Sequence, residues 1–209
     1  MPFWYRIGHT IARILFHGFF RYRAYNREKL ESVHGSGALI ASNHVSMFDP
    51  PLVGIAFRYA IYYLARKTLF DNPVNAFFYP RFQAIPVDQE RPEFGALKKI
   101  IKLAKSGEKV NIFPEGERSE DGRILPGQAG VGLVIAKSKV PVVPVRIFGA
   151  YEALPRGRTF PKLFTPITVV IGDPIVFSDE ELNVKDKDAY RALSQRVMDA
   201  IAEIENPRK

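Results

Sequence analysis

The chain of 209 residues contains no cysteine. A disulfide framework, a thiol nucleophile and a thiolate metal site are therefore excluded. The sequence also lacks three common motifs, namely the H-E-x-x-H zinc helix, the G-x-S-x-G nucleophile elbow and the G-x-x-x-x-G-K-[S/T] phosphate loop. Any chemistry must come from residues outside these patterns.

Long hydrophobic runs are missing from the N-terminal segment, although it is rich in aromatic residues. Its longest uncharged stretch, residues 14–20, has about seven residues, against roughly 20 needed to cross a bilayer. Arg13 and His17 interrupt the apolar residues, and no small-residue cleavage site follows. We therefore expect neither a transmembrane helix nor a signal peptide.

The same segment has the periodicity of an amphipathic helix. Bulky apolar residues recur along one side: Ile7, Ile11, Ile14, Leu15 and Phe19. Basic and polar residues share the opposite side: Arg6, His9, Thr10, Arg13, His17 and Arg21. This pattern is typical of a helix in the membrane interface; the alternative is a helix packed on its own domain. We expect residues 1–32 to form a membrane-surface segment and residues 33–209 to form one folded domain.

The chain carries 30 basic and 22 acidic residues, a formal net charge of +8. A basic surface suits nucleic acid, anionic lipid or an acidic protein. The basic residues are spread along the chain and no nucleic-acid-binding motif is present, so we expect no nucleic-acid partner. With 46% hydrophobic and 25% charged residues, the composition is that of a globular protein.

After residue 32, strand-like apolar runs alternate with segments of helical periodicity. We expect strands at residues 38–41, 62–65, 84–87, 109–113, 142–148 and 167–171. Helices are expected at residues 51–57, 92–105, 133–137 and 189–204. This alternation predicts a single α/β domain with a central, mostly parallel (mixed) sheet and helices on both faces. Residues 150–166 are one long, basic, proline-rich irregular stretch that could face the same membrane as the N-terminus.

His44 directly follows a predicted buried strand, and Asp49 lies five residues later. An imidazole is the usual general base for an alcohol, and a carboxylate can fix its tautomer. Five residues along one helix would place the two on different faces, so a turn must bring Asp49 back. Asp49 followed by Pro50 favours such a turn and a helix start. The alternative is that Asp49 only caps the helix.

A second polar loop follows the predicted strand at residues 109–113. It contains Glu115, Gly116, Arg118 and Ser119. The ends of strands are where α/β sheets place binding sites. The glycine permits close approach, the arginine offers a planar fork for phosphate and the serine adds a hydroxyl. An ordinary surface turn is the alternative.

Together these segments resemble the glycerolipid acyltransferase family, and within it the bacterial 1-acylglycerol-3-phosphate acyltransferases. The motifs that carry the resemblance are Asn43-His44 with Asp49, the loop Phe113-Pro114-Glu115-Gly116-x-Arg118-Ser119, and Val140-Pro141-Val142-Val143-Pro144-Val145. The similarity extends over residues 35–180. Residues 33–209 would then be the acyltransferase domain.

The resemblance implies a reaction and its substrates. His44 would deprotonate the hydroxyl of a lysophospholipid acceptor, supported by Asp49, and the alkoxide would attack the thioester of acyl-CoA or acyl-carrier protein directly. Glu115, Gly116, Arg118 and Ser119 would bind the glycerol phosphate end of the acceptor. Arg66, where the family usually has lysine, is a further candidate for phosphate binding. No metal and no cofactor are implied. Direct transfer needs a base but no protein nucleophile, which agrees with the lack of cysteine.

The sequence departs from the family pattern at several positions. Glu117 replaces the usual threonine, and Gln83 and Gln89 replace a glycine and an arginine, for which Arg91 is a candidate substitute. These changes leave the acceptor open: lysophosphatidic acid, a lyso-ornithine lipid or another lysophospholipid. A non-catalytic membrane-binding module is the alternative from another class, but it would be expected to have lost some of these site residues. We expect the protein on the cytoplasmic face of a membrane, bound peripherally or monotopically.

Overall fold

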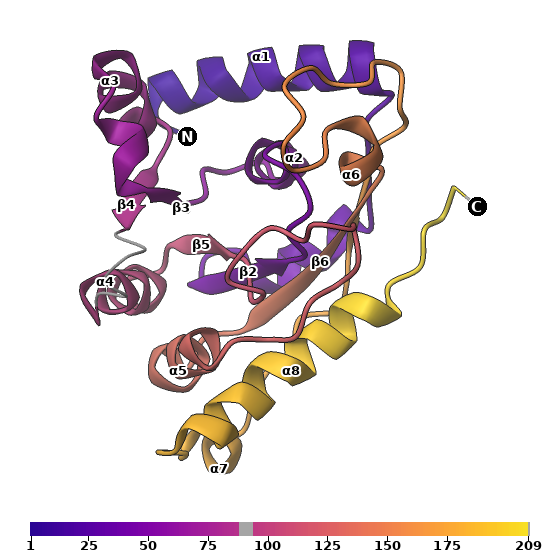
Figure 1. Ribbon diagram of the computed structural model, residues 1–209. Helices are drawn as coiled ribbons and strands as arrows, with labels where there is room; N and C mark the ends of the chain where they lie inside the picture. The colour runs from indigo at the N-terminus through magenta and orange to yellow at the C-terminus, as the bar shows by residue number, and fades with distance from the viewer. Residues whose placement is uncertain (88–93, 209) are drawn as a thin grey trace.

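A computed structural model describes residues 1–87 and 94–208, and its centre is a five-stranded sheet in the order β1-β7-β6-β2-β5 (Figure 1). The strands are β1 (Arg23–Tyr25), β2 (Ala38–Ser42), β5 (Lys109–Ile112), β6 (Val142–Phe148) and β7 (Thr168–Ile171). Every neighbouring pair is parallel except β6 with β7. The predicted mostly parallel, mixed sheet is confirmed.

A two-stranded parallel sheet of β3 (Tyr63–Arg66) and β4 (Ala84–Val87) continues the main sheet beyond β5. The connection is Tyr62, whose backbone N–H donates to Lys109 O and whose carbonyl accepts from Asn111 N, each over 2.8 Å. The strands expected at residues 62–65 and 84–87 therefore stand at this end of the sheet.

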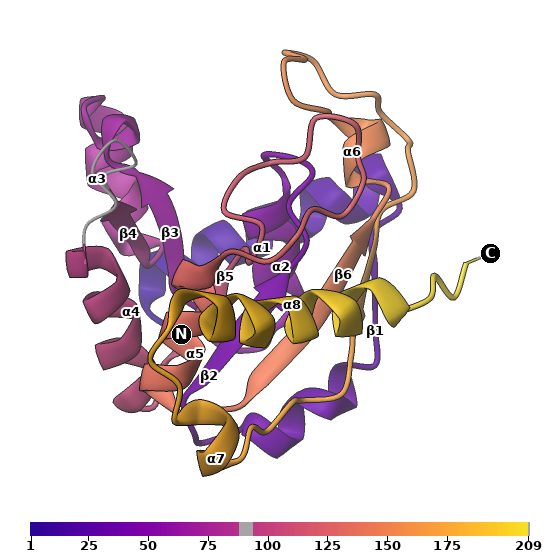
Figure 2. The same ribbon diagram turned by 60° about the horizontal axis from the view of Figure 1, so that its bottom comes forward.

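Helices cover both faces of the sheet (Figures 1 and 2). One face packs against α1 (Phe3–Phe20), α2 (Asp49–Ala56) and α6 (Ala150–Ala153). The other packs against α4 (Phe94–Lys105), α5 (Ala129–Ser138), α7 (Asp179–Leu182) and α8 (Lys187–Glu203). Helices α5 and α8 cross closely, since a Cβ at Gly132 would lie 1.7 Å from the carbonyl oxygen of Tyr190. The two apolar layers form the core on either side of the sheet.

Some elements escaped the sequence prediction. Helix α3 (Pro73–Arg81) contains Pro80 in its interior, and a proline there argues against a helix. It begins with a recognisable signal, because the Asn72 side chain accepts hydrogen bonds from the amides of residues 74 and 75. Strand β1 has only three residues and therefore no measurable periodicity. Two short 3-10 helices, Arg27–Val33 and Lys67–Phe70, were also not predicted. Gln89, Arg91 and the expected first residues of the helix at 92–105 lie outside the described residues.

Helix α1 has three faces. Its inner face is buried against the domain and consists of Tyr5, Phe16 and Phe20. His9 was predicted on the polar face but lies on this inner face, since it stacks on Tyr5 and its Nε2 lies 3.0 Å from the carbonyl oxygen of buried Phe57. A second face carries the other predicted polar residues of the helix. The remaining face is apolar yet exposed: Phe3, Trp4, Ile7, Ile11, Ile14, Leu15 and Phe19. The helix thus packs on its own domain and also presents bulky apolar side chains outward.

Helix α3 lies at one end of α1 and the loop after α6 lies at the other end (Figure 1). At the N-terminal end, Trp4 packs edge-on against Phe77 and Phe78 of α3. At the C-terminal end, the amide of Phe164 donates to Phe19 O, and Phe160 is 81% exposed in the same loop. Among the described residues, no helix is both long and apolar enough to cross a bilayer.

Candidate active site

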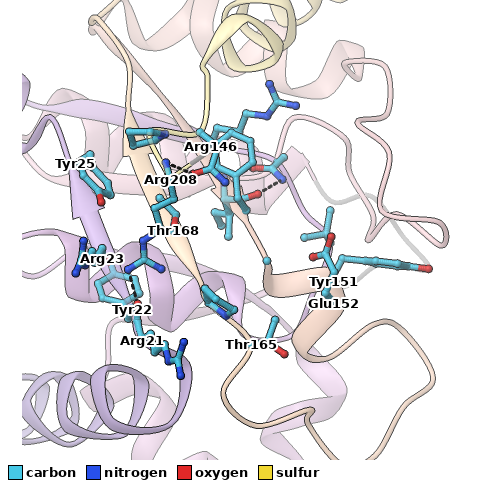
Figure 3. A pocket seen from close by; sticks show the side chains of 18 of the residues that line it. Arg21, Tyr22, Arg23, Tyr25, Arg146, Tyr151, Glu152, Thr165, Thr168 and Arg208 are labelled. Carbon is cyan, nitrogen blue, oxygen red and sulfur yellow. Dashed lines mark hydrogen bonds between the residues drawn. The ribbon is translucent and has the colours of Figure 1, made fainter.

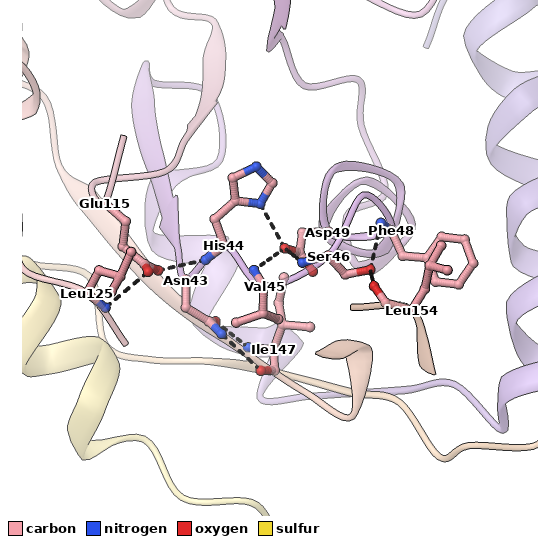
Figure 4. Close-up of polar contacts among 10 residues, drawn as sticks. All are labelled: Asn43, His44, Val45, Ser46, Phe48, Asp49, Glu115, Leu125, Ile147 and Leu154. Carbon is pink, nitrogen blue, oxygen red and sulfur yellow. Dashed lines mark hydrogen bonds and ion pairs between the residues drawn. The ribbon is translucent and has the colours of Figure 1, made fainter. Parts of the chain in front are cut away.

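The site is built at the carboxyl end of β2, whose five residues are all buried. Asn43 follows the strand and fixes its position, because its side chain both donates to and accepts from the backbone of Ile147 on β6. The chain then turns, and His44 projects its side chain away from Asn43 (Figure 4). The imidazole is only 18% exposed, so it borders solvent without being free in it.

Asp49 holds the imidazole from one side. Its Oδ2 lies 2.8 Å from His44 Nδ1 and also accepts hydrogen bonds from the amides of Val45 and Ser46 (Figure 4). The predicted turn therefore exists, and α2 begins at Asp49 itself, with Pro50 in its first turn. The carboxylate does not cap this helix, since the amides that it accepts from precede it in the sequence.

This arrangement selects the tautomer of His44. Burial raises the pKa of Asp49, and the hydrogen bond from His44 opposes that rise. The three donors around Oδ2 all favour the ionised carboxylate. Nδ1 then carries the proton, and Nε2, which points away from Asp49, is left as the free base. Phe113 stacks on the ring with centroids 3.8 Å apart and planes 14° apart, which restricts its rotation.

Glu115 supports the histidine through the backbone. Its Oε1 accepts from the His44 amide over 2.7 Å and its Oε2 accepts from the Leu125 amide over 3.0 Å (Figure 4). The side chain is buried, and burial raises its pKa to about 7, opposed by the two backbone hydrogen bonds and reinforced by the charge of Asp49. Glu115 thus joins the His44 turn to the loop that follows β5.

The rest of that loop is also bound to the His44 turn. The amide of Ser119 donates to the carbonyl of His44 over 2.8 Å, while its buried Oγ donates to Asp121. Gly116 has a φ of +77°, a conformation that favours glycine, and a Cβ there would lie 3.1 Å from Gln128. The loop is therefore held beside the histidine by bonds on both sides of Arg118.

Arg118 lies within a group of three arginines. Its pKa is lowered by partial burial and then by the positive charges of Arg156 and Arg66. Residues far apart in the sequence thus place the positive charges of Arg66 and Arg156 near Arg118, which favours an anion beside it. Arg156 also contacts Glu120 at 3.2 Å and Glu117 at 3.8 Å.

A family model described as acyltransferase matches residues 21–148, which include both the His44 turn and the Arg118 loop. The chain belongs to the acyltransferase family. It is 32% identical over 187 residues to the 1-acyl-sn-glycerol-3-phosphate acyltransferase of Bacillus subtilis (strain 168), and the match covers 88% of each chain.

Other relatives agree with this assignment. The chloroplastic 1-acyl-sn-glycerol-3-phosphate acyltransferase BAT2 of Brassica napus is 31% identical over 144 residues, which are 68% of this chain and 41% of that one. The crystal structure of the PlsC acyltransferase of Thermotoga maritima superposes with a TM-score of 0.72 at 23% identity, covering 97% of this chain and 81% of that one. This last likeness shows that the fold is shared.

The structure of this acyltransferase brings the sequence-predicted residues together in two linked groups. His44, Asp49 and Glu115 form one hydrogen-bonded group, and Arg118 with Arg66 forms the other. Sequence reasoning missed Arg156 and Phe113 as parts of the site. Arg156 lies in the irregular stretch after α6, where no pattern assigns a direction to a side chain. No group of three or more histidine, aspartate or glutamate side chains in the described part of the chain could hold a metal ion.

Proposed function

We propose that this acyltransferase moves a fatty acyl group from acyl-CoA or acyl-carrier protein to the free sn-2 hydroxyl of lysophosphatidic acid, which yields phosphatidic acid. One observation carries the proposal: a histidine oriented by a buried aspartate stands beside a loop whose arginine belongs to a three-arginine group. The names of the similar proteins from Bacillus subtilis and Brassica napus support the same acceptor.

In the proposed reaction, Nε2 of His44 takes the proton of the acceptor hydroxyl as its oxygen attacks the thioester carbon. The positive charge that develops on the imidazole is stabilised by Asp49, to which Nδ1–H already donates. The tetrahedral intermediate collapses with cleavage of the C–S bond, and the thiolate leaves and takes the proton from Nε2. The products are an ester and a free thiol, and His44 returns to its starting state.

The arginine group is suited to the acceptor phosphate. Arginine binds phosphate through paired N–H donors, and three guanidinium groups can balance a dianion. Glu117, the unusual acid in this loop, is 68% exposed and faces Arg156. Its carboxylate is therefore directed toward solvent and Arg156, which leaves Arg118 available for a phosphate monoester.

We further propose that the exposed apolar face of α1 docks on the cytoplasmic face of an anionic membrane. Phe77 of α3 and Phe160 of the loop after α6 extend this face at the two ends of the helix. Arg13 is exposed on the polar face of the helix and Arg21 is exposed at its C-terminal end, and attraction of each basic residue to anionic lipid contributes about 1 kcal/mol. A lysolipid acceptor lies in the same membrane, so docking supplies the substrate.

The test of the chemistry is turnover of His44→Ala with purified protein, labelled palmitoyl thioester and lysophosphatidic acid in anionic vesicles. Turnover should fall by about 10²–10⁴, the usual contribution of a general base. Asp49→Asn should lose less, because it leaves the imidazole in place. Near-normal turnover of His44→Ala would remove the proposal.

The acceptor is tested in the same assay. Lysophosphatidic acid should be acylated faster than a lyso-ornithine lipid or a lysophospholipid with a larger head group. A preference for one of these lipids would leave the proposed acyl transfer intact but would show that lysophosphatidic acid is not the acceptor. Folding of each variant is checked by its thermal unfolding midpoint.

A further inference from the structure

An open cavity of about 1190 Å³ lies at the β1 side of the main sheet (Figure 3). Asn43 and Val45, which flank the catalytic histidine in sequence, border this cavity, but His44 does not. Its walls come from β1, the end of β6, the start of β7 and the C-terminal tail. The cavity is therefore separate from the group formed by Arg66, Arg118 and Arg156, none of which lines it.

Four arginines line this cavity: Arg21, Arg23, Arg146 and Arg208 (Figure 3). Within residues 1–87 and 94–208, none of the four forms an ion pair with a carboxylate. One acidic residue, Glu152, lines the cavity, and it is exposed. The cavity therefore carries a surplus of positive charge.

Backbone contacts hold this charge in place. Arg146 donates to the carbonyl oxygens of Ala202 and Ile204 at the end of α8, the second over 2.8 Å. Arg208 donates in turn to the carbonyl of Arg21, which folds the tail back onto β1. Hydrogen bonds from Arg23 and Arg208 lower the pKa of the Tyr25 hydroxyl between them.

Gathered like charges repel one another, so the cluster is stabilised by an anion that enters it. Guanidinium groups and hydroxyls are the donors that phosphate prefers. We propose that this arginine-lined cavity is a second anion site, which binds a ligand bearing a phosphate monoester or diphosphate. The proposal stands whether or not His44 catalyses acyl transfer.

Two sources could supply that phosphate. The cavity adjoins the exposed apolar surface, because Arg21 and Thr165 line it while the neighbouring Phe19 and Phe164 face outward. A lipid headgroup could therefore enter from a membrane under α1. The volume also admits a soluble nucleotide such as CoA, since ligand pockets of roughly 300–1,000 Å³ accept molecules of that size.

The test uses the full chain and the double variant Arg23→Gln/Arg208→Gln. Arg23 is exposed and Arg208 is partly buried, and neither belongs to the His44 or Arg118 groups. The matched control is Lys187→Gln/Arg191→Gln, which removes the same charge from an exposed part of α8. Binding of CoA is measured by calorimetry, and flotation is measured with vesicles of phosphatidylcholine mixed equally with phosphatidic acid or with phosphatidylglycerol.

If the phosphate is soluble, the cavity variant should bind CoA about tenfold or more weakly than the control, as expected for the loss of two charge-assisted donors. If it belongs to a lipid, the variant should lose the preference for phosphatidic acid over phosphatidylglycerol. Equal binding of all probes by the variant and the control would overturn the proposal. So would a loss shared equally by both vesicles, because that outcome reflects general surface charge.

Discussion

At the scale of single residues, the orientation of His44 depends on contacts with side chains from two loops. Asp49 fixes the ring nitrogen, Phe113 stacks on the ring, and Glu115 binds the amide of the same residue. A base is effective only when its lone pair is aligned with the proton that it removes. The buried polar groups around His44 therefore serve mainly to hold Nε2 in one direction.

Glu115 should make stability depend on pH. Its pKa is about 7 in the folded protein, against 4.5 when unperturbed. Because the folded state binds the proton more tightly, the free energy of unfolding should fall as pH rises from about 4.5 through 7, by roughly 3 kcal/mol. Glu115→Gln removes the titrating group, so the variant should lose this pH dependence and its stability relative to wild type should rise across this range.

The measurement is denaturant unfolding of wild type and Glu115→Gln at a series of pH values. All other ionisable groups are common to both proteins, so the difference between the two curves isolates Glu115. Glu120→Gln removes an exposed carboxylate from the same loop and controls for net charge. Parallel curves for wild type and Glu115→Gln would show that the carboxyl is not perturbed.

Arg118→Lys should affect the KM for the acceptor and the KM for the acyl thioester differently. Lysine keeps the charge but not the fork, so the KM for lysophosphatidic acid should rise by about tenfold while the KM for the acyl thioester changes little. Arg156→Lys should act in the same direction and more weakly, because this residue also contacts two glutamates. The control is Arg123→Lys, an exposed arginine paired with Asp121. Equal effects on both KM values would assign Arg118 to the donor or to the fold.

At the scale of elements, α1 has both a buried inner face and an exposed apolar outer face. Its inner face contributes to the core, so deleting the helix would remove buried aromatic side chains together with any membrane contact. Substitutions on the outer face are the cleaner test. Ile11→Asn/Ile14→Asn changes two residues that are 53% and 67% exposed, and it should leave the unfolding midpoint nearly unchanged.

The same double variant should bind anionic vesicles about tenfold or more weakly, because two apolar side chains no longer enter the interface. Activity on vesicle-borne acceptor should fall in parallel, while activity on a short-chain soluble acceptor should persist. Val176→Asn is the matched control: Val176 is 72% exposed but lies beside α7, away from α1. Unchanged vesicle binding by the α1 variant would mean that this face covers something other than a membrane.

At the scale of the whole molecule, the sequence predicted every strand of the sheet except β1 at one edge. The core strands were predictable because their burial produces apolar runs, as at residues 38–41 of β2 and 142–145 of β6. Strand β1 is held by its partner β7 rather than by its own three residues. Helix α3 depends on a cap that offsets an unfavourable proline. Hydrophobic periodicity reveals neither the pairing of a short strand with its neighbour nor the effect of a helix cap.

The site, too, has parts that the sequence could predict and parts that it could not. His44 and Asp49 could be paired from the sequence, because they are five residues apart and the proline after Asp49 indicates the turn that joins them. The grouping of Arg156 with Arg118 depends on the tertiary position of the loop after α6, which the local sequence does not determine. The role of Glu115 is similar. Its type and place were predictable, but its two backbone partners, residues 44 and 125, were not.

Only Arg21 and Tyr22 separate α1 from β1, and Tyr22 is buried with its hydroxyl donating to the carbonyl of Leu52. The helix thus has no flexible tether, and a protein resting on α1 is held at one height and one tilt above the lipid. A lysolipid offers its glycerol at a nearly constant depth in the bilayer. In the proposed docking, acyl transfer then requires the free sn-2 hydroxyl of the acceptor to lie level with Nε2 of His44.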